Sequence, residues 1–258
     1  MYDIQIKWLT VTCFEMKFGD ITIVSDPFIG QSPFNDLTYE DIENCDIITL
    51  SHTHFDHVTD IPNLMRKFPA KLLCGTLAAM PMLEYVDCNP SRIYPMDSNL
   101  ELDFTKIKIK ALFGRHTTIA YNSLAALNEL FDNHKVCQQD KKLREMQILG
   151  SLEYRNFLIT YNGVKVLIWG NDIDEVQKNM VAQLKPDICI LQFSRQKAED
   201  VAELAYLSGC KVLIPHHMDL VKTKEEYMPS VLNLQKEFYK RVPDGRFIIP
   251  ENGQWIDL

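Results

Sequence analysis

The sequence has 258 residues, of which 46% are hydrophobic and 24% charged, a balance that is ordinary for a globular protein with a sizeable core. The formal net charge of -8 excludes binding of nucleic acid by general electrostatic attraction, because contact with many phosphates needs a basic surface. No apolar run reaches the length of a membrane span, and the first residues lack the apolar stretch of a signal peptide, so we expect a cytoplasmic protein.

The first half of the chain is rich in predicted strands. Short apolar runs are separated by turn signals such as Gly19-Asp20, and one run alternates polar and apolar residues with period two, as a half-buried strand does. The predicted elements here are strands at 3–9, 11–18, 20–26, 46–50 and 106–111, and a helix at 76–85 with Thr76 as its candidate N-cap.

Residues 119–150 interrupt this pattern, because they favour two helices of mixed charge and no strand. We expect this segment to form either a lid or pocket wall, or an oligomer contact. Beyond it, Asn162-Gly163 predicts a hairpin turn between two apolar runs. The predicted elements of this part are strands at 154–160 and 164–169, a strand at 187–192, a helix at 196–207, a strand at 211–214 and a helix at 223–241.

These elements predict a mixed α/β fold in which hairpins alternate with crossovers that carry helices. Two sheets packed together, with helices outside, would accommodate them. No linker or repeat divides the chain, so residues 1–258 are read as one domain. The seven cysteines are scattered and form no CxxC pair, which predicts free thiols rather than disulfides or a thiolate zinc site.

Six of the seven histidines lie in three short windows, at 51–57, 114–117 and 215–219. Each window directly follows an apolar strand, where a sheet can direct several side chains toward one point. Histidine is the commonest metal ligand, and neutral imidazole together with carboxylate suits zinc and its first-row neighbours. The three windows therefore predict a metal site.

The first window contains the pattern H-x-H-x-D-H, formed by His52, His54, Asp56 and His57. Four coordinating groups within six residues are too crowded for the tetrahedral shell of one metal. They suit two metals that share one loop, with alternate side chains facing opposite ways.

In these windows the sequence resembles the metallo-β-lactamase fold superfamily of metal-dependent hydrolases, and the ligand windows follow the family order over nearly the whole chain. Residues 8–18, 23–28 and 50–57 are similar to the L-ascorbate-6-phosphate lactonase-like branch, which also includes phospholipase D-type enzymes acting on N-acyl phosphatidylethanolamine. The resemblance implies a four-layer αβ/βα sandwich of two mixed sheets, with metals at one edge of the sheets.

The resemblance also implies a ligand set for two metal ions. His52, His54 and His116 would hold the first, and Asp56, His57 and His217 the second, with Asp172 bridging both. Asp172 ends an apolar strand where Gly170 lets the backbone turn, whereas Asp174 is expected to cap the next helix.

The last window leaves two adjacent candidates. The branch places its ligand two residues after the proline, often followed by an aromatic residue and then Asp. This pattern favours His217 over His216, with Met218 in place of the aromatic and Asp219 retained. Asp26 is expected to brace the ligand loop by hydrogen bonds. His134 is read as a surface histidine.

Two divalent ions, zinc first and manganese as the alternative, would convert a bridging water to hydroxide near neutral pH. Asp56 and His217 are the expected catalytic residues, with Asp56 orienting the water or delivering a proton. No GxSxG, P-loop or GxGxxG motif offers another mechanism. A charge count leaves the site with about one positive charge, which favours a small anionic substrate, either a lactone or a phosphodiester.

Candidate anchors for the anionic group are Arg115, Arg155 and Arg195, by position only. The expected partner is a small-molecule substrate, with no nucleic acid and no membrane span, and a homo-oligomer stays open. A lipid substrate would need an apolar channel, for which residues 119–131 could serve. The same fold leaves three alternatives: an iron-dependent redox protein, an RNA-processing nuclease and a non-hydrolytic metal-binding protein. The redox protein is disfavoured because diiron relatives carry a carboxylate at the position of His54.

Overall fold

A computed structural model describes residues 2–30, 32, 35–116, 141–170, 173–220 and 222–258. Over these residues, the strands form two seven-stranded sheets. The first sheet has the order β14-β1-β2-β3-β4-β5-β6. Its strands are β1 (Ile4–Thr10), β2 (Cys13–Phe18), β3 (Ile21–Ser25), β4 (Ile47–Thr49), β5 (Lys71–Gly75), β6 (Ile93–Met96) and β14 (Trp255–Asp257).

The second sheet has the order β13-β12-β11-β10-β9-β8-β7. Its strands are β7 (Glu101–Asp103), β8 (Ile107–Gly114), β9 (Tyr154–Tyr161), β10 (Val164–Trp169), β11 (Ile188–Gln192), β12 (Val212–His216) and β13 (Arg246–Phe247). Both sheets have an antiparallel part and a parallel part: β3 to β6 run parallel, as do β10 to β13. The carboxyl ends of parallel strands meet at one edge of each sheet, where loops can combine into a site.

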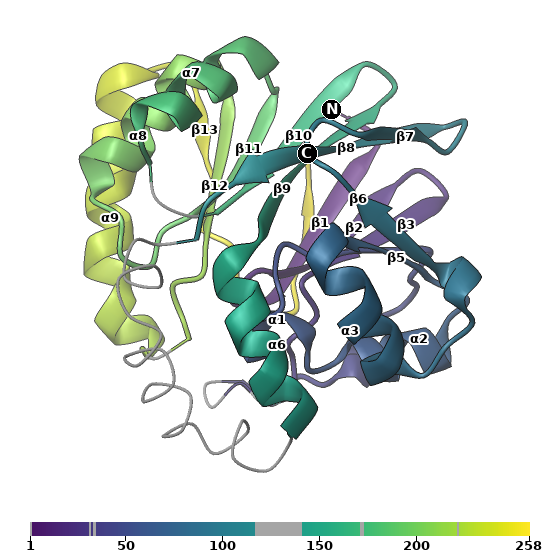
Figure 1. Ribbon diagram of the computed structural model, residues 1–258. Helices are drawn as coiled ribbons and strands as arrows, with labels where there is room; N and C mark the ends of the chain where they lie inside the picture. Colours follow the sequence, from purple (N-terminus) through teal and green to yellow (C-terminus); the bar gives the residue numbers. More distant parts are fainter. Residues whose placement is uncertain (1, 31, 33–34, 117–140, 171–172, 221) are drawn as a thin grey trace.

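Helices cover the outer faces of the paired sheets. In Figure 1, α7, α8 and α9 lie on one side of the molecule, whereas α1, α2, α3 and α6 lie on the other, beside the first sheet. The helices are α1 (Phe55–Val58), α2 (Ile61–Lys67), α3 (Thr76–Val86), α6 (Lys141–Leu152), α7 (Glu175–Leu184), α8 (Ala198–Ser208) and α9 (Lys224–Arg241), with 3₁₀ turns η1 (Tyr39–Asp41) and η2 (Pro90–Arg92). The predicted αβ/βα sandwich is confirmed.

Two apolar clusters hold these layers together. One contains inward-facing side chains of both sheets, such as Trp8 and Phe157, and continues to α8 and α9. An edge-on ring contact between Phe18 and Tyr161, with centroids 5.9 Å apart, joins the sheets directly. The second cluster lies between the first sheet and its helices, and it includes Met146 of α6. Burial on both faces explains why strands of the parallel parts, such as β4, β5, β11 and β12, read as nearly continuous apolar runs.

The hairpin predicted at Asn162-Gly163 is confirmed, because both residues have positive φ (49° and 82°) between the paired strands β9 and β10. The prediction of Thr76 as an N-cap is wrong. Gly75 is the N-cap of α3, and the Thr76 hydroxyl donates to Asp97 Oδ1 at 2.6 Å. Instead, Glu153 stabilises the start of the helix, because its carboxylate accepts the Ala78 N–H at 3.2 Å.

Other predicted boundaries shift by a few residues. The helix expected from residue 196 begins at Ala198, and the strand expected at 211–214 extends to His216. Of the two helices expected at 119–150, the second corresponds to α6, whereas the first lies outside the described residues, as do His134 and residues 119–131.

Among the described helices, none is both long and apolar enough to cross a membrane. The cysteines in the described part of the chain are all free, as the sequence predicted: Cys13, Cys45, Cys74, Cys88, Cys189 and Cys210.

Candidate metal centre

The predicted ligand windows meet at one edge of the two sheets. His52 and His54 follow β4 and precede α1, which carries Asp56 and His57. The second sheet contributes one histidine after β8 and one after β12. Within the described residues, two groups of three side chains could each hold a metal ion. In each group, the three candidate ligand atoms lie within 4.8 Å of one another. His52, His54 and His116 form the first group, and Asp56, His57 and His217 form the second.

The imidazoles of the first group lie close together. The ring centroid of His54 lies 4.5 Å from the ring centroid of His52 and 4.5 Å from that of His116. The second group is adjacent, because the His52 and His57 centroids are 4.0 Å apart. Three imidazole nitrogens near one point are a donor set that suits zinc and related divalent metals. The structure thus brings six of the seven predicted ligands into two neighbouring groups of three.

The second group is built around the Asp56 carboxylate. Asp56 Oδ2 is 3.6 Å from His57 Nε2 and 3.6 Å from His217 Nε2. His216, the competing residue, is fully buried and directs its Nε2 to the Trp169 carbonyl oxygen at 3.1 Å. His217 therefore faces the other members of the group, as the sequence analysis favoured, and His216 is part of the core.

The predicted bridging residue, Asp172, lies outside the described residues. Gly170 just before it has a clear reason to be glycine, because a Cβ there would lie 2.1 Å from the Tyr154 hydroxyl oxygen. Asp174 is the N-cap of α7 and accepts the Gln177 N–H at 2.9 Å. The capping role expected for Asp174 is confirmed.

Asp26 holds the ligand loop, residues 51–57, by hydrogen bonds, as predicted. Its Oδ1 accepts the Ser51 N–H at 2.6 Å, and its Oδ2 accepts the Ser51 hydroxyl at 2.7 Å. Oδ2 also lies 2.9 Å from His57 Nδ1. A carboxylate that accepts the second ring N–H of a metal-binding histidine fixes the ring and makes the other nitrogen a better ligand. Asp26 therefore orients His57 and the loop in front of it.

A strained turn positions His217. Val11 has φ of 48° and His217 has φ of 62°, a left-handed conformation that is a genuine outlier for a β-branched valine. The His217 N–H donates to Val11 O at 2.8 Å, and the Val11 N–H donates to Asp219 Oδ1 at 2.9 Å. Thr10 Oγ1 adds a 2.7 Å bond to Asp219 Oδ2. Backbone strain of this kind persists where the surroundings over-determine it, as at binding sites.

Tyr154 is a buried neighbour of the site that the sequence analysis did not single out. Its ring stacks on His52, with centroids 4.7 Å apart and 29° between the planes. Burial is the main cause that raises the pKa of the Tyr154 hydroxyl, so the group stays neutral. Only its position at the start of a strand marked it in the sequence, and that signal does not distinguish a site residue from a core residue.

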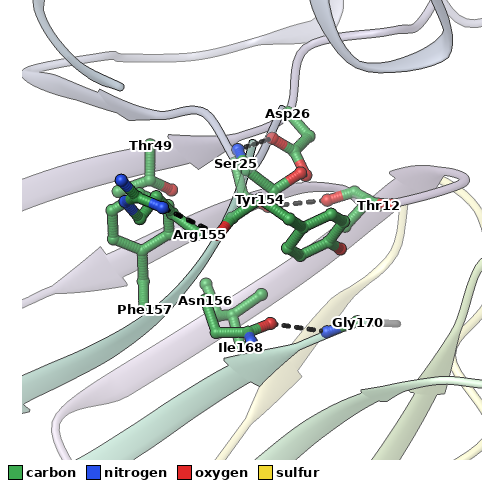
Figure 2. A pocket seen from close by; sticks show the side chains of 11 residues that line it. Thr12, Ser25, Asp26, Thr49, Tyr154, Arg155, Asn156, Phe157, Ile168 and Gly170 are labelled. Atoms are coloured by element: carbon green, nitrogen blue, oxygen red, sulfur yellow. Dashed lines mark hydrogen bonds between the residues drawn. The ribbon is translucent and has the colours of Figure 1, made fainter. Parts of the chain in front are cut away.

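Figure 2 shows side chains that line a cavity of about 10 Å³, among them Asp26, Tyr154 and Asn156. The hydroxyls of Thr12 and Thr49, which also line it, are buried and have no hydrogen-bond partner in the described part of the protein. The cavity is about the size of one water molecule.

Burial governs the protonation of the imidazoles. It is the main cause that lowers the pKa of His52 and His54 well below the usual value, and neighbouring histidines add to the effect. Burial also lowers the pKa of His217 to about 4. For His57, Asp56 and Asp26 outweigh burial and raise the pKa. Burial alone would raise the pKa of Asp56, but the nearby histidines lower it. Burial therefore keeps His52 and His54 neutral, and the second group contains an ionised carboxylate.

The three candidate anchor arginines differ in their surroundings. Arg155 is largely buried and bonds to the Met96 carbonyl and to Glu153, so it is a structural residue. Arg115 pairs with Asp174 at 3.2 Å, at the rim of a surface hollow of about 410 Å³. Arg195 is exposed, makes no ion pair with any described residue, and lies close enough to His217 to help burial lower its pKa.

A family model described as a beta-lactamase superfamily domain matches residues 5–141. A relative named as a metal-dependent hydrolase, from Methylacidiphilum infernorum, is 30% identical over 105 residues, which are 40% of this chain and 45% of that protein. The chain thus matches less than half the length of this relative, and the same holds for others.

The fold is similar to solved structures of low sequence identity. A metallo hydrolase from Ignicoccus hospitalis has a TM-score of 0.72 at 14% identity, with 98% of this chain and 97% of that chain covered. An isothiocyanate hydrolase from Delia radicum gut bacteria has a TM-score of 0.67 at 14% identity, with 98% of both chains covered.

Proposed function

Because this chain belongs to the beta-lactamase superfamily, we propose that it is a metal-dependent hydrolase with two divalent ions, zinc or alternatively manganese. The observation that carries the proposal is the pair of three-residue groups at one sheet edge. His52, His54 and His116 would hold one ion, and Asp56, His57 and His217 the other. Asp172, outside the described residues, is proposed to bridge them.

The donor chemistry fits such ions. Burial lowers the pKa of His52, His54 and His217, so each imidazole is neutral near pH 7, the form that binds a metal. Asp26 supplies the outer carboxylate that metal-bound histidines usually have. Ions bound there supply Lewis acidity, which lowers the pKa of water and polarises the bond to be cleaved.

The chain's own residues would do the remaining work. Asp56, buried and ionised between two imidazoles, is positioned to orient the attacking water and to hold its proton for the leaving group. His217 completes the same group. Arg195, exposed and without an ion pair among the described residues, is the proposed anchor for an anionic substituent. Arg115 and Arg155 are engaged elsewhere.

We propose a small, ester-like, anionic substrate, either a lactone or a phosphodiester. The similarity to the lactonase-like branch favours the lactone but stays a prediction. A relative of the same fold is named as an isothiocyanate hydrolase, so the panel of test substrates should extend beyond esters.

The test is metal analysis of the purified protein, followed by a panel of a p-nitrophenyl phosphodiester, a phosphomonoester, several lactones and an isothiocyanate. We expect close to two metal equivalents and hydrolysis of at least one class, abolished by a chelator and restored by zinc or manganese. A protein that binds neither metal would overturn the proposal, as would full activity in His54→Ala. An RNA oligonucleotide in the panel tests the nuclease alternative.

A further inference from the structure

Helix α6 contacts the ligand loop on both sides of His54. The Thr53 hydroxyl donates to the Met146 carbonyl oxygen at 2.7 Å, across 93 residues of sequence. The Phe55 N–H donates to the Gln147 side-chain oxygen at 3.1 Å. The residues before and after His54 are therefore both held by adjacent residues of one helix.

His54 itself is held by the same helix. Its imidazole hydrogen-bonds the Gln147 backbone, which acts against the larger effect of burial on its pKa. One turn further along, Gly150 packs directly on the loop. A Cβ at this position would lie 2.6 Å from His54 Cδ2 and 2.8 Å from the His54 backbone nitrogen. Only glycine lets the helix approach this closely.

The helix is itself firmly anchored. Leu143 and Met146 belong to the apolar cluster beneath the first sheet, and Gln147 is fully buried. The Gln147 amide nitrogen also donates to the Leu143 carbonyl oxygen at 3.0 Å, which fixes the orientation of the side chain. An amide that is buried and bonded at both ends has one available geometry, so it can position the loop that it bonds.

The second ligand group has a different support. His57 bonds to Asp26, which follows a strand of the first sheet, and His217 bonds to the Val11 turn. The family match ends at Lys141, the first residue of α6. The contacts from α6 therefore come from a part of the chain beyond the family match.

We propose that Gln147 and Gly150 are positioning residues for the first ligand group, which set its metal affinity by fixing His54 without contacting the metal. The inference rests on the proposed function, because it takes His54 as a ligand. It assigns the described end of the 119–150 segment a role as a wall of the metal centre.

The experiment measures the affinity of the 258-residue chain for each zinc equivalent by competition with a chromophoric chelator, together with metal content. Test variants are Gln147→Leu, Gly150→Ala and Thr53→Val. Each has a matched control. Gln177→Leu removes another fully buried glutamine, Gly30→Ala adds a methyl group in open space, and Thr53→Ser keeps the hydroxyl. His116→Ala identifies which equivalent belongs to the first group.

We expect each test variant to weaken the equivalent that His116→Ala removes by about 10- to 100-fold, the usual effect of losing an outer-shell partner. The other equivalent should keep its wild-type affinity, and all three controls should keep both. Unchanged affinities in Gln147→Leu and Gly150→Ala would overturn the inference and leave the proposed function standing. Equal weakening of both equivalents would also overturn it.

A wild-type protein without zinc affinity would instead overturn the proposed function. If Gly150→Ala does not fold, as judged by thermal unfolding, Gln147→Leu and its control Gln177→Leu still decide the question, since only the first loses the bond to the Phe55 N–H.

Discussion

The two ligand groups lie side by side but are supported in different ways. The first, with His52, His54 and His116, is held by neutral contacts, namely the stacked ring of Tyr154 and the close approach of α6. The second is held by buried carboxylates and by backbone in an unfavourable conformation. The first group thus depends on packing and neutral hydrogen bonds, and the second on charge and strain.

This difference predicts unequal metal affinity. The first group offers three imidazoles and no carboxylate, whereas the second contains the ionised Asp56 and a histidine backed by Asp26. A bridging Asp172 would add the same charge to both groups and leave the difference in charge between them unchanged. Because opposite charges attract more strongly in a poorly hydrated site than in water, the second group should hold its ion more tightly.

The largest expected effect is loss of a ligand. His54→Ala should lose one metal equivalent and at least about 100-fold in activity, since a direct ligand contributes more than the 10- to 100-fold of an outer-shell partner. Metal content and turnover of the best substrate in the panel check this. If His54→Ala retained both equivalents, the first group would not be a metal site.

The next effect is on the order of metal loss. A chelator titration should remove the ion of the first group first. Asp26→Asn should weaken binding of the second ion by about 10- to 100-fold and so reduce the difference in affinity between the two groups. Mass spectrometry under native conditions, with His116→Ala and His217→Ala as single-site references, measures both. Loss of the second ion first would contradict the charge argument.

Residues His216 and His217 separate stability from metal binding. His217→Ala should lose the second ion. His216→Ala should keep both ions but lower the free energy of unfolding by about 2–4 kcal/mol, as other large-to-small changes in a core do. Denaturant unfolding with metal content checks this. Loss of an ion only in His216→Ala would reverse the assignment.

The smallest effect concerns the substrate. Arg195→Ala should raise KM for an anionic substrate by about 2- to 5-fold with little change for a neutral analogue, because exposed charge pairs contribute at most about 1 kcal/mol. Arg115→Ala is the control, since this side chain already pairs with Asp174. Equal changes for both substrates would remove Arg195 as the anchor.

The sequence was sufficient to predict what local spacing and strand ends encode. The H-x-H-x-D-H pattern and His217 follow the parallel strands β4 and β12, and His116 follows β8, which pairs antiparallel with β7 and β9. The supports of these residues could not be predicted in the same way. Gln147 contacts the loop across 92 residues, and the carboxylate that accepts the Ala78 N–H at the start of α3 belongs to Glu153, 75 residues away. Such contacts depend on the packed fold rather than on any neighbouring residue.

The contact between Asp219 and the Thr10–Val11 turn joins positions 209 and 208 residues apart. During synthesis, Asp219 emerges only after the 208 residues that follow Val11 have been made. Contacts between distant segments form late, since the loop that they close must first be ordered. A nascent chain can therefore expose H-x-H-x-D-H long before the second group is complete, and capture of metal into its final geometry should be among the last events of folding.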